Sequence, residues 1–260
     1  MLERFNSLWF GSELGYLEQL SIKSAQALGH EYTLYSYEPE QLRGVPAGVD
    51  LRDANEVMSD PKRTKHFAGK FKALGSDFFR YELLAKELGY WVDLDLIFLK
   101  PFDFAEPHVF GWEREGSING AVLKMPAESP MLKVLRDIPE RNWCPPFFGP
   151  RRKLEYYWQR LRGDVELEDL PWGVAGPGLI TYLAKKMGFA AQAQAKPVFY
   201  PIDYFEAEIL FGPRAEVERH LTPDTHAIHM WHSRIVKRAG TAPEPGSYLA
   251  ELCAEHGVGG

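Results

Sequence analysis

Two aspartates separated by one residue interrupt an apolar stretch of the sequence. In the stretch 90–99, YWVDLDLIFL, every residue is apolar or aromatic except Asp93 and Asp95. Burying an unpaired carboxylate costs several kcal/mol and two adjacent carboxylates repel each other, so a buried pair needs a compensating positive charge. If the stretch is one strand, residues i and i+2 point to the same side. The two carboxylates can then bind a hard divalent cation such as Mn²⁺ or Mg²⁺.

Such a cation usually takes one or two protein carboxylates together with phosphate oxygens, which makes a nucleoside diphosphate a natural partner of the site. The spacing alone is not specific to metal binding. Three glutamate pairs share it and are interpreted as solvated surface pairs, namely Glu113/Glu115, Glu166/Glu168 and Glu206/Glu208. The alternative for Asp93 and Asp95 is an exposed strand end at which the acids pair with Lys or Arg.

The segment before the two aspartates has the pattern of an amphipathic helix. Ser76 is a suitable N-cap for this helix, and Gly89 is a suitable end for it. A strand should follow and end before Pro101, because proline cannot donate a ladder hydrogen bond. Asp77 and Arg80 are three residues apart and so share a helix face. The simplest alternative for Asp77 and Arg80 is an intrahelical ion pair.

The whole stretch 76–102, SDFFRYELLAKELGYWVDLDLIFLKPF, resembles the signature of glycosyltransferases whose sugar-binding region contains a DXD motif. These are family 32 and its relatives, including bacterial capsule and lipopolysaccharide transferases and the alpha-1,4-galactosyltransferases; the stretch is also similar to the glucosylating domain of the large clostridial toxins. The resemblance implies that Asp77 and Arg80 hold donor-sugar hydroxyls. It implies that Asp93 and Asp95 hold Mn²⁺, or Mg²⁺, and the nucleotide.

The resemblance also implies a fold and a reaction. The fold is a GT-A-like α/β single domain, with a mainly parallel central sheet and flanking helices. The reaction moves a hexose from a nucleotide diphosphate sugar, with UDP-sugar favoured, to a saccharide or lipid-linked acceptor in bacterial surface polysaccharide synthesis. The metal is expected to act as a Lewis acid on the departing diphosphate. The resemblance also implies that the transfer retains the anomeric configuration of the sugar, through front-face attack by the acceptor.

The beginning of the chain favours the same fold class. A strand at 7–10, a helix at 13–27 and a strand at 32–37 form a strand-helix-strand unit, which gives a mainly parallel sheet with ligands at the carboxyl ends of its strands. The resemblance implies that Trp9, Gly11 and Tyr37 border the nucleoside base. The alternative for the two aromatic residues is a place in the core.

The chain has 260 residues and no low-complexity linker, so one domain is expected over 1–260. Residues 1–102 should form its nucleotide-sugar half, 103–240 its acceptor half and 241–260 a peripheral tail. A net charge of -6 argues against nucleic-acid binding. No apolar run reaches membrane-helix length and the start of the chain lacks a signal-peptide pattern, so we expect a cytoplasmic protein. Cys144 and Cys253 are expected to be free thiols.

Two basic segments have alternative interpretations. The run 61–72, PKRTKHFAGKFK, is either a solvated face or a lid over the diphosphate. The segment 142–153, NWCPPFFGPRRK, ends in Arg151, Arg152 and Lys153. It is either a solvent-facing loop or a peripheral contact with an anionic lipid surface at the inner face of the membrane.

The acceptor side has weaker candidates. Asn119 is expected at a tight bend with Gly120, near the acceptor or only forming the turn. The segment WGVAGPG resembles a family element beneath the reaction centre. Its Gly176 and Gly178 would let the backbone approach a ligand, although a plain helix start has the same appearance.

Two histidines follow the last predicted strand, 227–230. The resemblance implies that one of them completes the Mn²⁺ site; His229 is favoured and His232 is the alternative. Lys237 is a candidate contact of the diphosphate.

Two other function classes remain as alternatives to a glycosyltransferase. A glycoside hydrolase needs two carboxylates that flank the scissile bond, and a non-catalytic nucleotide-sugar or carbohydrate-binding module does not need both aspartates.

Overall fold

A six-stranded sheet forms the centre of the computed structural model, which describes residues 2–67 and 71–259. Its strand order is β3-β2-β1-β4-β7-β6, and β5 and β8 form a separate two-stranded sheet. The strands are β1 Phe5–Leu8, β2 Tyr32–Ser36, β3 Asp50–Asp53, β4 Tyr90–Val92, β5 Leu96–Phe98, β6 Val109–Arg114, β7 Ser117–Lys124 and β8 Ala227–His229. The prediction of an α/β chain with a mainly parallel sheet is confirmed, since β1 to β4 are parallel and β7 alone among the described strands of this sheet runs against them.

The strand order creates a switch point between β1 and β4. From β1 the chain moves outward through β2 and β3, and then returns to place β4 on the other side of β1. Connections on the two sides of such a point diverge, so a crevice opens beyond the carboxyl ends of the two strands. The residues that follow Leu8 and Val92 therefore border this crevice.

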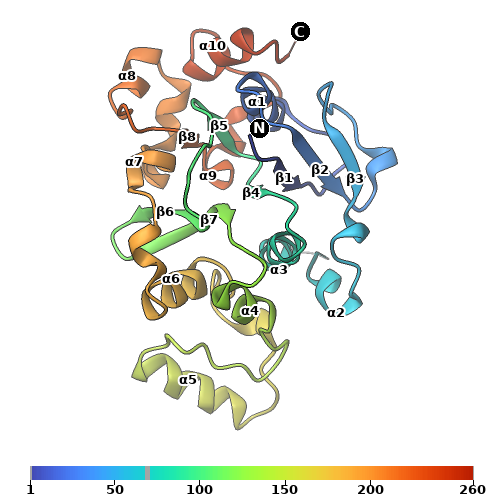
Figure 1. The fold of residues 1–260 in the computed structure, drawn as a ribbon, viewed down its shortest axis with the longest axis vertical. Coiled ribbons are helices and arrows are strands. Elements are labelled where there is room, and N and C mark those ends of the chain that lie inside the picture. Colours follow the sequence, from blue (N-terminus) through green and yellow to red (C-terminus); the bar gives the residue numbers. More distant parts are fainter. Residues whose placement is uncertain (1, 68–70, 260) are drawn as a thin grey trace.

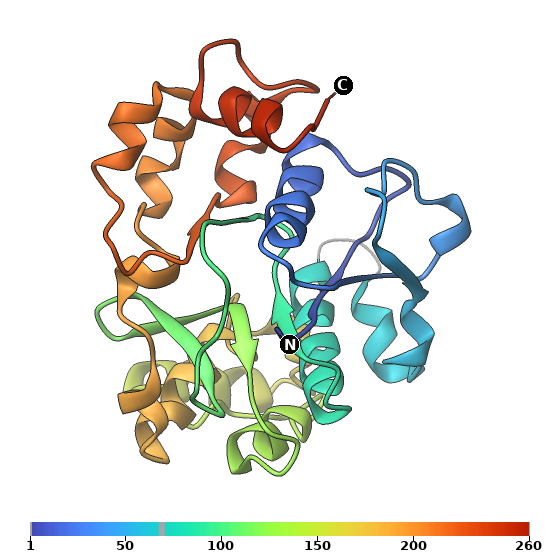
Figure 2. The same ribbon diagram turned by 45° about the horizontal axis from the view of Figure 1, so that its top comes forward.

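Helices cover both faces of the sheet (Figures 1 and 2). One face packs on α3, α4 and α6, and the other packs on α1 and on the β5–β8 pair. The helices are α1 Tyr16–Ala27, α2 Pro61–Thr64, α3 Lys72–Ala85, α4 Pro130–Arg136, α5 Pro150–Arg160, α6 Pro177–Lys186, α7 Lys196–Phe199, α8 Arg214–Glu218, α9 His232–Ala239 and α10 Tyr248–Glu255. Alternation along the strands explains the two cores: Leu34 packs in one and its neighbour Tyr35 in the other.

The stretch around the two aspartates differs from its prediction. We expected one strand over 90–99, but β4 ends at Val92 and β5 begins at Leu96. Residues 93–95 form the connection, and the two strands belong to different sheets. Because the connection leaves the central sheet at the switch point, the polar residues of the stretch lie where the chain changes direction.

Three further local predictions are wrong. Ser76 is not an N-cap, because α3 begins one turn earlier at Lys72. Asn119 and Gly120 do not form a tight bend, because both lie within β7; the hairpin turn is at 115–116. The helix was also expected to end at Gly89, but α3 ends at Ala85 with Lys86 as its C-cap, and Gly89 instead directly precedes β4. The φ of Gly89 is +109°, and a Cβ there would lie 2.4 Å from the carbonyl oxygen of Arg4.

Other expectations concern single segments. Cys144 and Cys253 are free thiols, as predicted. The predicted basic lid, 61–72, lies partly outside the described residues, at 68–70. Among the described residues, none of the helices combines the length and apolar character that crossing a bilayer demands.

Candidate metal centre and active-site cavity

A cavity of about 1150 Å³ opens at the switch point of the sheet. Trp9 and Phe10, which follow β1, form one part of its wall, and Asp93 and Asp95, which follow β4, form another. Its volume is slightly above the usual range of small-molecule sites, about 300–1,000 Å³, and its position is the one expected for a ligand in an open α/β sheet.

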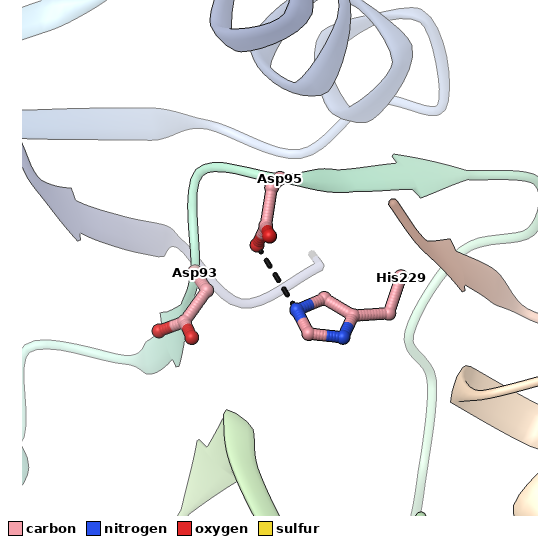
Figure 3. A group of neighbouring side chains, drawn as sticks. All are labelled: Asp93, Asp95 and His229. Atoms are coloured by element: carbon pink, nitrogen blue, oxygen red, sulfur yellow. Dashed lines mark hydrogen bonds and ion pairs between the residues drawn. The ribbon is translucent and has the colours of Figure 1, made fainter. Parts of the chain in front are cut away.

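Asp93, Asp95 and His229 converge in this cavity (Figure 3). Each offers one ligand atom, and the three atoms lie within 4.8 Å of one another. The aspartates come from the β4–β5 connection. His229 comes from β8, whose antiparallel pairing with β5 sets it opposite Leu96, next to Asp95. The convergence therefore depends on the small β5–β8 sheet as well as on the central one.

Hydrogen bonds orient both carboxylates. Asp93 Oδ1 accepts a bond from Trp91 Nε1 at 2.7 Å and lies 3.3 Å from Arg80. Asp95 Oδ2 accepts the backbone N–H of His232 at 2.8 Å, and its Oδ1 lies 3.1 Å from His229 Nε2. Fixed outer partners of this kind hold ligand groups in one orientation.

The three groups differ in their electrostatic surroundings. Burial raises the pKa of Asp93 above its ordinary value, although Arg80 opposes the rise. Burial acts in the same direction on Asp95, but the charge and hydrogen bond of His229 outweigh it and bring the pKa of Asp95 below its ordinary value. Burial lowers the pKa of His229, and the two aspartates reverse this effect so that its pKa lies above the ordinary value. The protonation of each group therefore depends on the charges of the other two.

A divalent cation fits this donor set. Carboxylate oxygens suit Mg²⁺ and Mn²⁺, and one imidazole is compatible with Mn²⁺. His229 presents its Nε2 to the two carboxylates, 3.1 Å from Asp95 Oδ1, while its Nδ1 is buried without a hydrogen-bond partner among the described residues. The remaining positions around an ion would face the cavity, where phosphate or water oxygens can fill them.

Asp77 and Arg80 lie beside this cluster on α3. Both are buried, and they approach each other to 3.5 Å, so the ion pair weighed as their alternative is present. Arg80 also donates to the carbonyl oxygen of Gly120 at 2.9 Å. Burial raises the pKa of Asp77 to about 6, against the effect of Arg80. A carboxylate held at this cost, with a cavity in front of it, is typical of a binding site.

The two late histidines have different surroundings. The imidazole of His229 faces the aspartates, whereas that of His232 pairs with Glu18 at 3.3 Å. His232 is the first residue of α9 and reaches Asp95 only through its backbone N–H. Trp231 between them has φ +57°, an uncommon value for a non-glycine residue, and its Nε1 donates to the carbonyl oxygen of Ile202.

The structure brings eight of the predicted site residues into the cavity wall, namely Trp9, Asp77, Arg80, Asp93, Asp95, Asn119, His229 and His232. The other five do not line the cavity, namely Gly11, Tyr37, Gly176, Gly178 and Lys237. Tyr37 instead packs on Phe10 and donates its hydroxyl to the carbonyl oxygen of Met58 at 2.8 Å. Lys237 is exposed on α9. Gly176 lies directly behind Asp77, because a Cβ there would be 2.5 Å from Asp77 Oδ2.

Several cavity residues have no sequence signal that we recognised. Glu113 was interpreted as part of a solvated pair, but its side chain is 16% exposed and accepts hydrogen bonds from Ser117 and Asn119. Glu206 is exposed, yet it also lines the cavity. Three large aromatic side chains stand exposed at the cavity wall: Trp172, Tyr204 and Phe205. A sequence shows where aromatic residues occur but not which of them are exposed, so these three could not be assigned to the cavity in advance.

Comparisons with known proteins give little beyond this geometry. No protein-family model matches the chain, and no curated protein matches it either. Among solved structures, the chain is similar to one described as PaToxG Glycosyltransferase, with 16% sequence identity and a TM-score of 0.49. The match covers 73% of this chain and 72% of that chain.

Proposed function

We propose that this chain is a metal-dependent glycosyltransferase that uses a nucleotide diphosphate sugar. The observation that supports this most directly is the Asp93–Asp95–His229 cluster beside the buried Asp77–Arg80 pair in one cavity. A GT-A-like arrangement is proposed with it, on the parallel β1–β4 sheet and on the resemblance of the stretch 76–102 to DXD-motif enzymes.

Asp93, Asp95 and His229 would hold Mn²⁺, or Mg²⁺, at the diphosphate. When bound, the cation neutralises the negative charge of the departing nucleotide diphosphate. Trp91 and the backbone N–H of His232 keep the carboxylates aimed at the cavity. The chain's own contribution is therefore a set of ligand groups that are oriented toward the cavity before the nucleotide sugar arrives.

The donor sugar would lie against Asp77 and Arg80. Both are already buried and charged, so hydroxyl groups placed there replace water with fixed hydrogen-bond partners. Trp9 and Phe10, at the end of β1, offer aromatic faces for the nucleoside, for which we favour uridine. The hexose and the base stay predictions that rest on the resemblance.

The acceptor would enter beside the exposed aromatics Trp172, Tyr204 and Phe205. Exposed apolar surface of this extent at a cavity wall marks a binding surface, and aromatic faces with neighbouring carboxylates suit a saccharide. The acceptor proposed is thus a saccharide, free or lipid-linked. Retention of configuration and a role in bacterial surface polysaccharide synthesis remain part of the proposal.

A donor screen tests the activity. Purified protein is incubated with UDP-, GDP- and other nucleotide sugars plus Mn²⁺, and release of free nucleotide diphosphate is measured with and without chelator. We expect release from one donor class, dependent on Mn²⁺, and its loss in Asp95→Asn. The variant keeps the size of the side chain while removing its charge, so the fold should persist.

The same screen separates the alternatives. Hydrolysis of glycosides in the absence of any nucleotide sugar would show that the chain is a glycoside hydrolase and not a transferase. Mn²⁺-dependent nucleotide-sugar binding that leads to no transfer or hydrolysis, over a panel of saccharide acceptors, would favour a binding module.

A further inference from the structure

Helix α5 exposes almost all of its surface. Of its residues Pro150–Arg160, only Tyr156 is buried. The helix lies at one end of the molecule, away from the central sheet (Figure 1, bottom). Helices of this length are marginal in water by themselves, and most gain their stability by covering an apolar face. On α5 the apolar face is not covered by the described part of the chain.

Four large apolar side chains form a stripe along this helix. Leu154, Tyr157, Trp158 and Leu161 are spaced i, i+3, i+4 and i+7, which places them on one face. They are 60%, 56%, 57% and 79% exposed. We call these four residues the α5 stripe. Solvent is an unfavourable surrounding for such a stripe, so a partner surface is expected.

The stripe points away from the body of the protein. On a helix with 100° between residues, Tyr156 and Arg152 lie on the side opposite the centre of the stripe. Tyr156 is buried, and the guanidinium of Arg152 lies over the ring of Phe148, 5.6 Å from its centroid. These two residues attach the helix to the body and leave the stripe directed outward.

Basic residues flank the stripe on both sides. Arg151 borders one side, and Lys153 and Arg160 border the other. Residues 150–162 contain five Lys or Arg and one acid, in a chain whose net charge is -6. Arg151 pairs with Glu155 and Arg160 pairs with Asp164, but all four of these side chains remain largely exposed. The segment therefore carries an excess of positive charge, and three of its five basic residues, Arg151, Lys153 and Arg160, border the stripe.

We propose that α5 docks this chain on an anionic lipid surface. An apolar stripe flanked by basic residues is the arrangement of an interfacial helix, with the apolar side chains at the acyl boundary and the cations among the headgroups. Trp158 and Tyr157 suit this boundary because each combines an apolar ring with a polar group. A second copy docked stripe to stripe would bring the basic residues of the two helices together, whereas an anionic lipid surface complements them, so charge favours lipid as the occupant. The docking does not depend on the proposed transferase activity.

Vesicle flotation tests the docking. The full chain is mixed with neutral phosphatidylcholine vesicles, or with vesicles that contain phosphatidylglycerol, at low and high salt. We expect binding to the anionic vesicles, weakened by salt. Replacing Arg151 and Lys153 by Gln should weaken it by about fivefold for each charge. Trp158→Ser with Leu161→Ser should weaken it at least tenfold.

Matched controls keep the outcome specific to α5. Lys133→Gln removes an exposed lysine on α4, and Trp172→Ser removes an exposed tryptophan at the cavity. Both variants should bind vesicles like the parent chain. Equal binding to neutral and anionic vesicles, or equal binding by the α5 variants and the parent, overturns the proposal. Analytical ultracentrifugation gives a second contradicting outcome. If the parent chain is a dimer and the Trp158→Ser/Leu161→Ser variant is a monomer, the stripe is covered by a second copy and not by lipid.

Thermal unfolding followed by circular dichroism separates docking from folding. The four replaced side chains are exposed, so we expect the variants to unfold with the parent chain. If the Trp158/Leu161 variant unfolds early, Leu154→Ser alone provides the second measurement of vesicle binding. Donor turnover in solution should stay unchanged in the α5 variants whether or not docking fails.

Discussion

His229 Nε2 lies 3.1 Å from Asp95 Oδ1, although 134 residues separate the two in the chain. The β5–β8 ladder produces this contact, because it sets Leu96 opposite His229 and continues with a bond from the Met230 N–H to the carbonyl oxygen of Asp95 at 2.8 Å. Backbone pairing, and not a flexible loop, therefore sets the position of the imidazole. His232 is close in sequence, yet its imidazole pairs with Glu18.

The contrast predicts different effects of the two histidines on metal use. His229→Ala removes a candidate ligand, so we expect the Mn²⁺ concentration for half-maximal nucleotide release to rise by roughly tenfold or more. His232→Ala keeps the backbone N–H that binds Asp95, so this Mn²⁺ concentration should change by less than about threefold. Titrations of activity with Mn²⁺ compare the variants. A larger shift in His232→Ala reverses the assignment, and no shift in either leaves the ion to the aspartates.

Asp77 should reduce stability at neutral pH. Its pKa of about 6 in the folded protein exceeds the ordinary 3.8, so the folded state takes up this proton more readily than the unfolded state. The contribution of Asp77 to stability is therefore present below about pH 4 and is lost as the pH rises to about 6. Asp77→Asn does not titrate, so its stability relative to the parent should grow over this range, by up to about 3 kcal/mol.

Denaturant unfolding in chelator at pH 4, 5, 6 and 7 measures this difference. Because every other titrating group is shared, the difference between variant and parent isolates Asp77. A constant difference across the range would show that the carboxylate is not destabilised by burial. The same variant should bind the intact nucleotide sugar more weakly than the parent does, while its affinity for the free nucleotide diphosphate changes less.

Gly176 should act through Asp77 without touching a ligand. An alanine Cβ at 176 would lie 2.5 and 2.6 Å from the two carboxylate oxygens, so the carboxylate has to move. A displacement near 1 Å can cost up to about 10²-fold in a site built for one geometry. We therefore expect Gly176→Ala to weaken the nucleotide sugar more than the nucleotide diphosphate, as measured by calorimetry.

Gly149→Ala is the matched control for this variant. Gly149 also precedes a helix, and a Cβ there meets nothing within 4 Å. The control should bind both ligands like the parent chain. If Gly176→Ala does the same, Asp77 is not held by its surroundings in the way described above.

The sequence predicts the elements around the site better than the site itself. Apolar periodicity predicts α1, the body of α3 and the β1–β2 pair to within a few residues, because burial of one face determines each of them. The grouping of Asp93 and Asp95 was expected from a single strand. It arises instead from a connection between two sheets, since local patterns do not distinguish a buried strand from two short strands with a turn.

Residues that join the cavity from elsewhere in the chain escape such reasoning. Glu113 has the same spacing to Glu115 as a solvated pair, and only the β6–β7 hairpin brings it against Asn119. Tyr37 was expected at the nucleoside from the resemblance, and Lys237 at the diphosphate from its place just after the histidines, but the Tyr37 hydroxyl bonds to Met58 and Lys237 is exposed on α9. The burial of Glu113 in the cavity and the places of Tyr37 and Lys237 outside it depend on tertiary packing, which one sequence does not reveal.

Trp172 and Phe205 should control the acceptor and not the donor. Both are more than 80% exposed at the cavity wall, so their removal leaves no void in the core. With a saccharide acceptor found by screening, Trp172→Ala and Phe205→Ala should each raise the acceptor KM by about fivefold or more, the cost of losing an aromatic contact of about 1 kcal/mol. Donor hydrolysis in the absence of acceptor should be unchanged, because neither side chain belongs to the Asp93–Asp95–His229 cluster.

Trp158→Ala is the control, since it removes an exposed tryptophan on α5, outside the cavity. Steady-state kinetics with soluble acceptor measure all three variants. An equal fall of donor hydrolysis and transfer would place these aromatics at the donor, and an unchanged acceptor KM would remove them from the acceptor site.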